Sequence, residues 1–158
     1  MINDSKGYIR LSFGPKWKYV ACVRSFVQSF LAISISDSKK ADKISMAVSE
    51  LVENAVKYNA KEKTWIYLEV LSEEKAQILI EVENYALPEN IQTLKNEVKK
   101  IYQKPPIEAY LEKMQEAVLK GNNTSQLGLA RIRCEANCDI DVEMKPDNIV
   151  KVKAMFMD

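Results

Sequence analysis

The chain has 158 residues, of which 47% are hydrophobic, and this is enough to bury the core of one domain. Lys and Arg total 23 and Asp and Glu total 22, so the net charge is +1. That balance argues against a general nucleic-acid binder, which usually carries a basic excess. No apolar run approaches the ~20 residues of a membrane-spanning helix, so we expect no membrane insertion. Because the first residues also lack the pattern of a signal peptide, we expect a cytoplasmic protein.

The residue types present limit the chemistry further. The sequence contains no histidine, which excludes Ser-His-Asp catalysis, Cys-His catalysis and a phosphohistidine relay within this chain. Its three cysteines, Cys22, Cys134 and Cys138, are too few for a disulfide framework. Cys134 and Cys138 could share a helix face, but a zinc site lacks further ligands. We expect the cysteines to be small buried hydrophobic residues.

Hydrophobic periodicity predicts five helices and five strands. The predicted helices span residues 16–33, 38–58, 89–103, 107–120 and 126–137. The predicted strands span residues 8–13, 64–71, 76–84, 139–145 and 150–156. Trp17 and Phe26 belong to the apolar stripe of the first helix, and Met144 is expected on the inward face of its strand. Ser36 or Asp37 can cap the second helix.

The segment 88–124 interrupts the alternation of strands and helices. It contains two helical patterns separated by Pro105 and Pro106, which cannot continue a helix. We interpret it as a helical insert that serves either as a mobile lid or as an interaction surface. The resulting order, β-α-α-β-β-(insert)-α-β-β, predicts an α+β fold in which helices cover one face of a mostly antiparallel sheet. We expect residues 1–158 to form a single two-layer domain of this kind.

One polar stripe on the second predicted helix can carry chemistry. Glu50, Asn54 and Lys57 are spaced i, i+4 and i+7, so they share one side of the helix. An amide oxygen can bind Mg²⁺, a carboxylate can position or deprotonate a nucleophile, and an ammonium group can neutralise phosphate. The alternative is an ordinary solvated face of an amphipathic helix.

Residues 50–58, with the pattern Glu-Leu-x-x-Asn-Ala-x-Lys-Tyr, resemble the N box of the GHKL (Bergerat-fold) ATPase superfamily. The short length and the order of elements look most like its branch of anti-sigma-factor serine kinases. This resemblance implies that the chain binds ATP and Mg²⁺. It also implies that Glu50 is the catalytic carboxylate, that Asn54 holds the metal and that Lys57 adds charge at the phosphates.

The end of the strand at 76–84 corresponds to the adenine-binding box of the family. Asn84 continues the inward phase of that strand, so its side chain should enter the space between sheet and helices. By position, Asn84 replaces the family aspartate, and Ala86 and Pro88 replace two glycines. An asparagine oxygen can still accept a hydrogen bond from adenine, although it lacks the charge. The alternative is a turn asparagine that simply ends the strand.

The segment after the insert corresponds to the second glycine box, which surrounds the phosphates. Gly128 is retained, whereas Gln126 stands at the other glycine position. Ser125 could donate from its hydroxyl, and free amides at the start of the following helix favour an anion. Arg131 and Arg133 come next, and solvated surface charge is the alternative for both.

The Val-Glu-Asn-Tyr sequence at 82–85 and the long insert are similar to the SiaB-like subgroup of these kinases, in which an Asn takes the place of the Asp. The resemblance therefore implies a partner-switching serine/threonine kinase that phosphorylates a small STAS-like protein. The changes at Asn84, Ala86 and Gln126 leave an alternative: a catalytically inactive module that regulates by sequestering a protein partner. Relatives of this type often pair, so a homodimer is also open.

Overall fold

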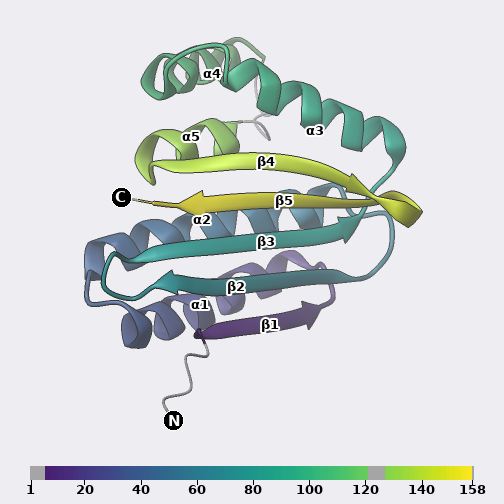
Figure 1. Ribbon diagram of the computed structural model, residues 1–158. Helices are drawn as coiled ribbons and strands as arrows, with labels where there is room; N and C mark the ends of the chain where they lie inside the picture. The colour runs from purple at the N-terminus through teal and green to yellow at the C-terminus, as the bar shows by residue number, and fades with distance from the viewer. Residues whose placement is uncertain (1–5, 121–126, 158) are drawn as a thin grey trace.

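The computed structural model describes residues 6–120 and 127–157. Within them, five strands form one antiparallel sheet in the order β1-β2-β3-β5-β4 (Figure 1). The strands are β1 (Tyr8–Phe13), β2 (Thr64–Ser72), β3 (Gln77–Tyr85), β4 (Cys138–Lys145) and β5 (Ile149–Phe156). The helices are α1 (Val20–Ser34), α2 (Ser38–Lys57), α3 (Pro88–Ile101), α4 (Pro106–Lys120) and α5 (Leu127–Glu135). Short 3₁₀ turns precede α1 (η1, Trp17–Tyr19) and link β4 to β5 (η2, Pro146–Asn148). The predicted order of elements and the two-layer α/β sandwich are confirmed.

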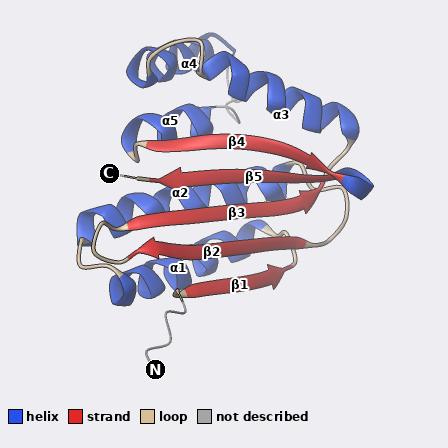
Figure 2. Cartoon of the chain, viewed as in Figure 1, coloured by secondary structure: helices blue, strands red, loops and turns tan. Residues whose placement is uncertain are grey.

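Only one face of the sheet carries the core. Along β3, Ile78, Ile80, Val82 and Asn84 are buried, whereas the residues between them are only partly buried. Figure 2 shows α1 and α2 behind the sheet, with α5, α3 and α4 beyond β4 in this view. The predicted inward phase of Asn84 is therefore confirmed, since its side chain faces the helices with its apolar neighbours. No helix in the described ranges combines the length and the apolarity needed to cross a membrane.

Helix α2 crosses the centre of the covered face and carries the polar stripe. The Asp37 side chain caps it by accepting a hydrogen bond from the Lys40 amide at 3.0 Å, as the sequence predicted. Two serines lie within the core, and each donates its hydroxyl to the carbonyl four residues earlier. Ser45 reaches Ala41 O at 2.7 Å, and Ser49 reaches Ser45 O at 3.4 Å. The helix is thus buried without unpaired hydroxyl groups on this side.

The insert forms the helix pair α3–α4, as predicted. Pro88 is at the first turn of α3 and Pro106 begins α4, positions where a helix needs no amide donor. Ile91, Leu94 and Ile101 are the buried residues of α3. Their burial packs α3 against the body of the fold.

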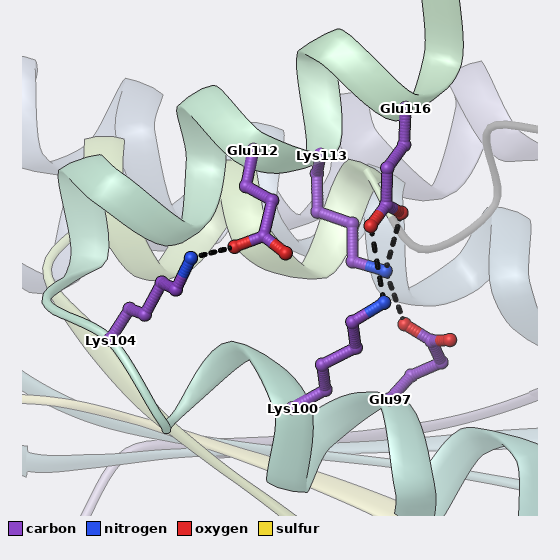
Figure 3. A network of polar contacts seen from close by, with 6 residues as sticks. All are labelled: Glu97, Lys100, Lys104, Glu112, Lys113 and Glu116. Atoms are coloured by element: carbon purple, nitrogen blue, oxygen red, sulfur yellow. Dashed lines mark hydrogen bonds and ion pairs between the residues drawn. The ribbon is translucent and has the colours of Figure 1, made fainter. Parts of the chain in front are cut away.

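Ion pairs join the two helices of the insert to each other (Figure 3). Lys113 Nζ, almost fully buried, lies 2.5 Å from Glu97 Oε2 and 3.2 Å from Glu116 Oε2. Lys100 Nζ lies 3.1 Å from Glu116 Oε1. A further pair beside them, Lys104 with Glu112, measures 2.5 Å. Because these pairs connect α3 with α4 or flank their junction, they favour movement of the two helices as one unit.

Some apolar residues do not take the expected inward position. Met144 is 52% exposed because it lies near the end of β4, one of the two edge strands of the sheet. Trp17 and Phe26 are 61% and 48% exposed, and Trp17 lies in the 3₁₀ turn rather than in α1. All three cysteines are free, and only Cys138 is buried; Cys22 is exposed, so the expectation of burial was wrong for that residue.

Candidate functional site

The polar stripe of α2 opens into a cavity of about 340 Å³. Glu50, Asn54 and Lys57 line it from α2, and Gly128 and Arg131 line it from α5. The other lining residues are Trp17, Glu53, Tyr110 and Leu127. The structure therefore brings the predicted stripe together with the retained glycine, although the whole insert separates them in the sequence.

Contact between Glu50 and α5 explains why position 128 is glycine. A Cβ atom added to Gly128 would overlap Glu50 Oε2 and lie 3.1 Å from Glu50 Cδ. Arg131, one turn further along α5, places its Nη1 atom 3.5 Å from Glu50 Oε1. The same guanidinium group also pairs with Glu135 at 3.0 Å. The carboxylate of Glu50 is thus held against the first turn of α5, next to a cation.

The environment raises the pKa of Glu50 above its ordinary value. Burial is the main cause, because it disfavours the charged carboxylate, and the nearby charge of Glu53 adds to the effect. The positive charge of Arg131 opposes both. A carboxylate with a raised pKa is a stronger base, which suits a group that takes a proton from a hydroxyl.

Asn84 and Ala86 lie in a second, adjoining cavity, not in the first. They line it with residues of α2, β5 and α3, among them Ile91 and Leu94. Its volume is only about 10 Å³. The Asn84 Nδ2 atom donates to the Tyr85 carbonyl at 3.0 Å, so the side chain is fixed in the space between sheet and helices.

Asn54 lines both cavities and therefore joins the two ends of the site. Within the described part of the chain, neither its buried Nδ2 atom nor the buried Oγ1 atom of Thr64 has a hydrogen-bond partner. Thr64 pairs with Asn84 in the β2–β3 register. Unpaired buried polar atoms are costly, and the one on Asn54, which lines both cavities, is a feature expected of a binding site.

The residues present fit a metal–triphosphate group at one end and do not accommodate a base at the other. The larger cavity offers a carboxylate, an amide, an ammonium and a guanidinium from Glu50, Asn54, Lys57 and Arg131. These are the groups that hold Mg²⁺ and phosphate oxygens. The smaller cavity has the polar group that could read a base, Asn84, but room for about one water molecule.

Some predicted residues have no place in this arrangement. Ser125 and Gln126 lie outside the described residues. Arg133 points away from the site; its guanidinium donates to the carbonyls of Ile101 and Lys104 and stacks on the Tyr102 ring at 4.0 Å. Its role is to fasten α5 to the insert.

Sequence reasoning did not single out four residues of the larger cavity, which are Trp17, Glu53, Tyr110 and Leu127. Trp17, Glu53 and Tyr110 come from three different elements. Of these three, only Glu53 had a sequence signal, since it lies one turn from Glu50 on α2. Trp17 and Tyr110 reach the cavity through tertiary packing.

Comparison with known proteins establishes the fold. No protein-family model and no curated protein gives a significant match to the sequence. Among solved structures, the chain is similar to one described as the crystal structure of the SiaB–SiaC complex from Pseudomonas aeruginosa. The match has a TM-score of 0.67 and covers 95% of this chain and 89% of that chain, at 13% sequence identity. At this identity the likeness shows a shared fold alone, and it supports the SiaB-like resemblance at that level.

Proposed function

We propose that this protein is a GHKL-type, Mg·ATP-dependent serine/threonine protein kinase that acts in partner switching. The observation that carries the proposal is the cavity of about 340 Å³ in which Glu50, Asn54, Lys57 and Gly128 meet. A solvated helix face would not need a glycine from another helix against its carboxylate, nor a buried amide without a partner. The arrangement is the one expected for positioning a phosphoryl group.

Each residue has a separate task in this proposal. Asn54 holds the magnesium ion, Lys57 and Arg131 neutralise phosphate charge, and the first turn of α5 at Gly128 offers backbone amides. Bound Mg·ATP supplies the phosphoryl group. Glu50 accepts the proton of a serine or threonine hydroxyl as that oxygen bonds to the terminal phosphorus, and the bond to the leaving ADP oxygen breaks.

The substrate in this proposal is a small STAS-like protein. The similar structure comes from a complex of two proteins, which supports a protein partner for the same fold. The larger cavity is partly open to solvent, and its walls include the exposed Trp17 residue. An open cavity can admit a hydroxyl from another chain to the carboxylate of Glu50.

A second candidate function is a module that binds a partner without catalysis. The closed base end, where Asn84 and Ala86 line only about 10 Å³, is the observation that favours it. The two functions differ in one requirement, since only the kinase needs nucleotide.

Calorimetric titration of the purified chain with ATP, with and without Mg²⁺, tests the proposal. We expect magnesium-dependent binding in the micromolar range, about −8 kcal/mol. If ATP fails to bind at millimolar concentration in the presence of Mg²⁺, the kinase proposal is wrong and the partner-binding module replaces it.

A further inference from the structure

Helix α3 fills the base end of the candidate site with its own side chains. Ile91 and Leu94 are 1% and 6% exposed, and both line the small cavity that contains Asn84. The opposite walls come from α2, β3 and β5. With about 10 Å³ left, the space holds about one water molecule and excludes a purine ring.

The closed space retains a polar group that the packing of α3 does not pair. Asn54 lines it, and its buried Nδ2 atom has no hydrogen-bond partner among the described residues. Thr64, which pairs with Asn84 in the β2–β3 register but does not line this cavity, has a buried Oγ1 atom in the same condition. An apolar plug leaves such atoms unsatisfied, whereas a heteroaromatic base can donate and accept hydrogen bonds. A base that bonds to Asn54 would therefore pair an atom that Ile91 and Leu94 leave unpaired, while its ring faces apolar walls.

The charged side chains of α3 join it to α4 rather than to the body of the fold. Its buried side chains, Ile91, Leu94 and Ile101, are apolar, and Arg133 of α5 holds its end through a hydrogen bond to the Ile101 carbonyl. Its charged contacts in Figure 3, Lys100 with Glu116 and Glu97 with Lys113, are made to α4. Outward movement of the first half of α3, which carries Ile91 and Leu94, opens the base end without breaking these charge pairs or the Arg133 hydrogen bond to Ile101.

We infer that α3 is an internal competitor of nucleotide: Ile91 and Leu94 occupy the space of the base, so α3 docking and base binding exclude each other. The inference rests on the proposed nucleotide site. The apparent affinity for nucleotide is then the intrinsic affinity reduced by the fraction of molecules with α3 displaced. A protein partner that captures displaced α3–α4 raises nucleotide affinity, and nucleotide raises partner affinity by the same factor.

The test compares Ile91→Ala with Ile44→Ala, which removes the same atoms from α2 at a core position that lines neither cavity. Calorimetry with Mg·ATP should show binding to Ile91→Ala at least about tenfold tighter than to the wild type. Ile44→Ala should bind as the wild type does. Mg·tripolyphosphate, which has no base, should bind all three proteins equally.

Three outcomes would overturn the inference. Equal ATP affinity of the wild type and of folded Ile91→Ala overturns it and leaves the proposed nucleotide site intact. An equal gain in tripolyphosphate affinity also overturns it, because the effect would then not concern the base. If none of the folded proteins binds ATP, the proposed site and the inference fail together.

Amide hydrogen exchange of the wild type, with and without Mg·ATP, tests the inference without any variant. Saturating Mg·ATP should accelerate amide exchange in α3, because the helix loses its packing against β5 and α2. If α3 instead closed over the nucleotide as a lid, ATP would slow its amide exchange. Slower or unchanged exchange in α3 on ATP binding would therefore overturn the inference.

Discussion

Replacing Gly128 by alanine tests whether the position of the Glu50 carboxylate matters for catalysis in the proposed kinase. The new Cβ would overlap Glu50 Oε2, so the carboxylate must move by about 1 Å to reach ordinary contact. The overlapped atom is the free end of a flexible side chain, and alanine is favoured over glycine in a helix by about 0.5–1 kcal/mol. We therefore expect the free energy of unfolding to change by less than about 1 kcal/mol.

The effect on catalysis should be much larger than the effect on stability. A displacement of 1 Å in a reacting group can reduce the rate about 100-fold, or about 2.7 kcal/mol in transition-state energy. The assay is slow ATP hydrolysis by the purified chain, in which water replaces the protein hydroxyl as acceptor, with urea unfolding measured on the same samples. Gly14→Ala is the matched control, because nothing lies within 4 Å of its added Cβ.

Two results would refute this reasoning. Turnover at the wild-type rate in Gly128→Ala would show that the position of Glu50 against α5 does not matter for transfer. A loss of several kcal/mol in stability would show that Glu50 cannot move aside, so that its role at this contact is structural.

The remaining predictions concern the metal, the carboxylate and the insert. Asn54→Ala should abolish the magnesium-dependent part of ATP binding, and an unchanged calorimetric affinity with Mg²⁺ would contradict a metal role. The pKa of Glu50 is raised in the folded state, so its ionisation opposes folding. Glu50→Gln should accordingly be more stable than the wild type near pH 7, and the gain should disappear as pH falls below the ordinary pKa of glutamate. Urea unfolding at both pH values measures this, and a gain that persists at low pH would contradict it. Lys113→Met should lose about 1–2 kcal/mol in unfolding free energy, a moderate value because its partners are partly exposed. Glu97→Gln should lower the unfolding free energy less in the Lys113→Met protein than in the wild type. Additive losses would show that Lys113 and Glu97 are not coupled.

Much of the fold could be predicted from the sequence, because strand alternation, helical spacing and helix capping depend on residues that are close together in the chain. The alternation that ends in Asn84 assigned that residue to the inward face, and the spacing of Glu50, Asn54 and Lys57 placed them on one side of α2. Asp37 was among the predicted caps because capping depends on immediate neighbours. These features need no knowledge of which elements meet in space.

The features that the sequence did not predict depend on contacts between distant segments. A helix at 89–103 was expected, but periodicity does not say that Ile91 and Leu94 line the same cavity as Asn84. The two arginines of α5 looked equivalent in sequence. Packing then directs Arg131 to Glu50 and Arg133 to the carbonyls of the insert.

The strand order has a consequence for how this chain reaches its folded state. β5 is the last strand described in the chain, yet it lies inside the sheet, between β3 and β4. Its pairing joins Ile78 to Phe156, so the two ends of that contact are separated by the entire insert. Pairings between such distant segments form slowly, because the intervening loop must be ordered first. During synthesis, the edge of β3 that pairs with β5 remains open until β5 has left the ribosome, and this interval exposes the chain to aggregation.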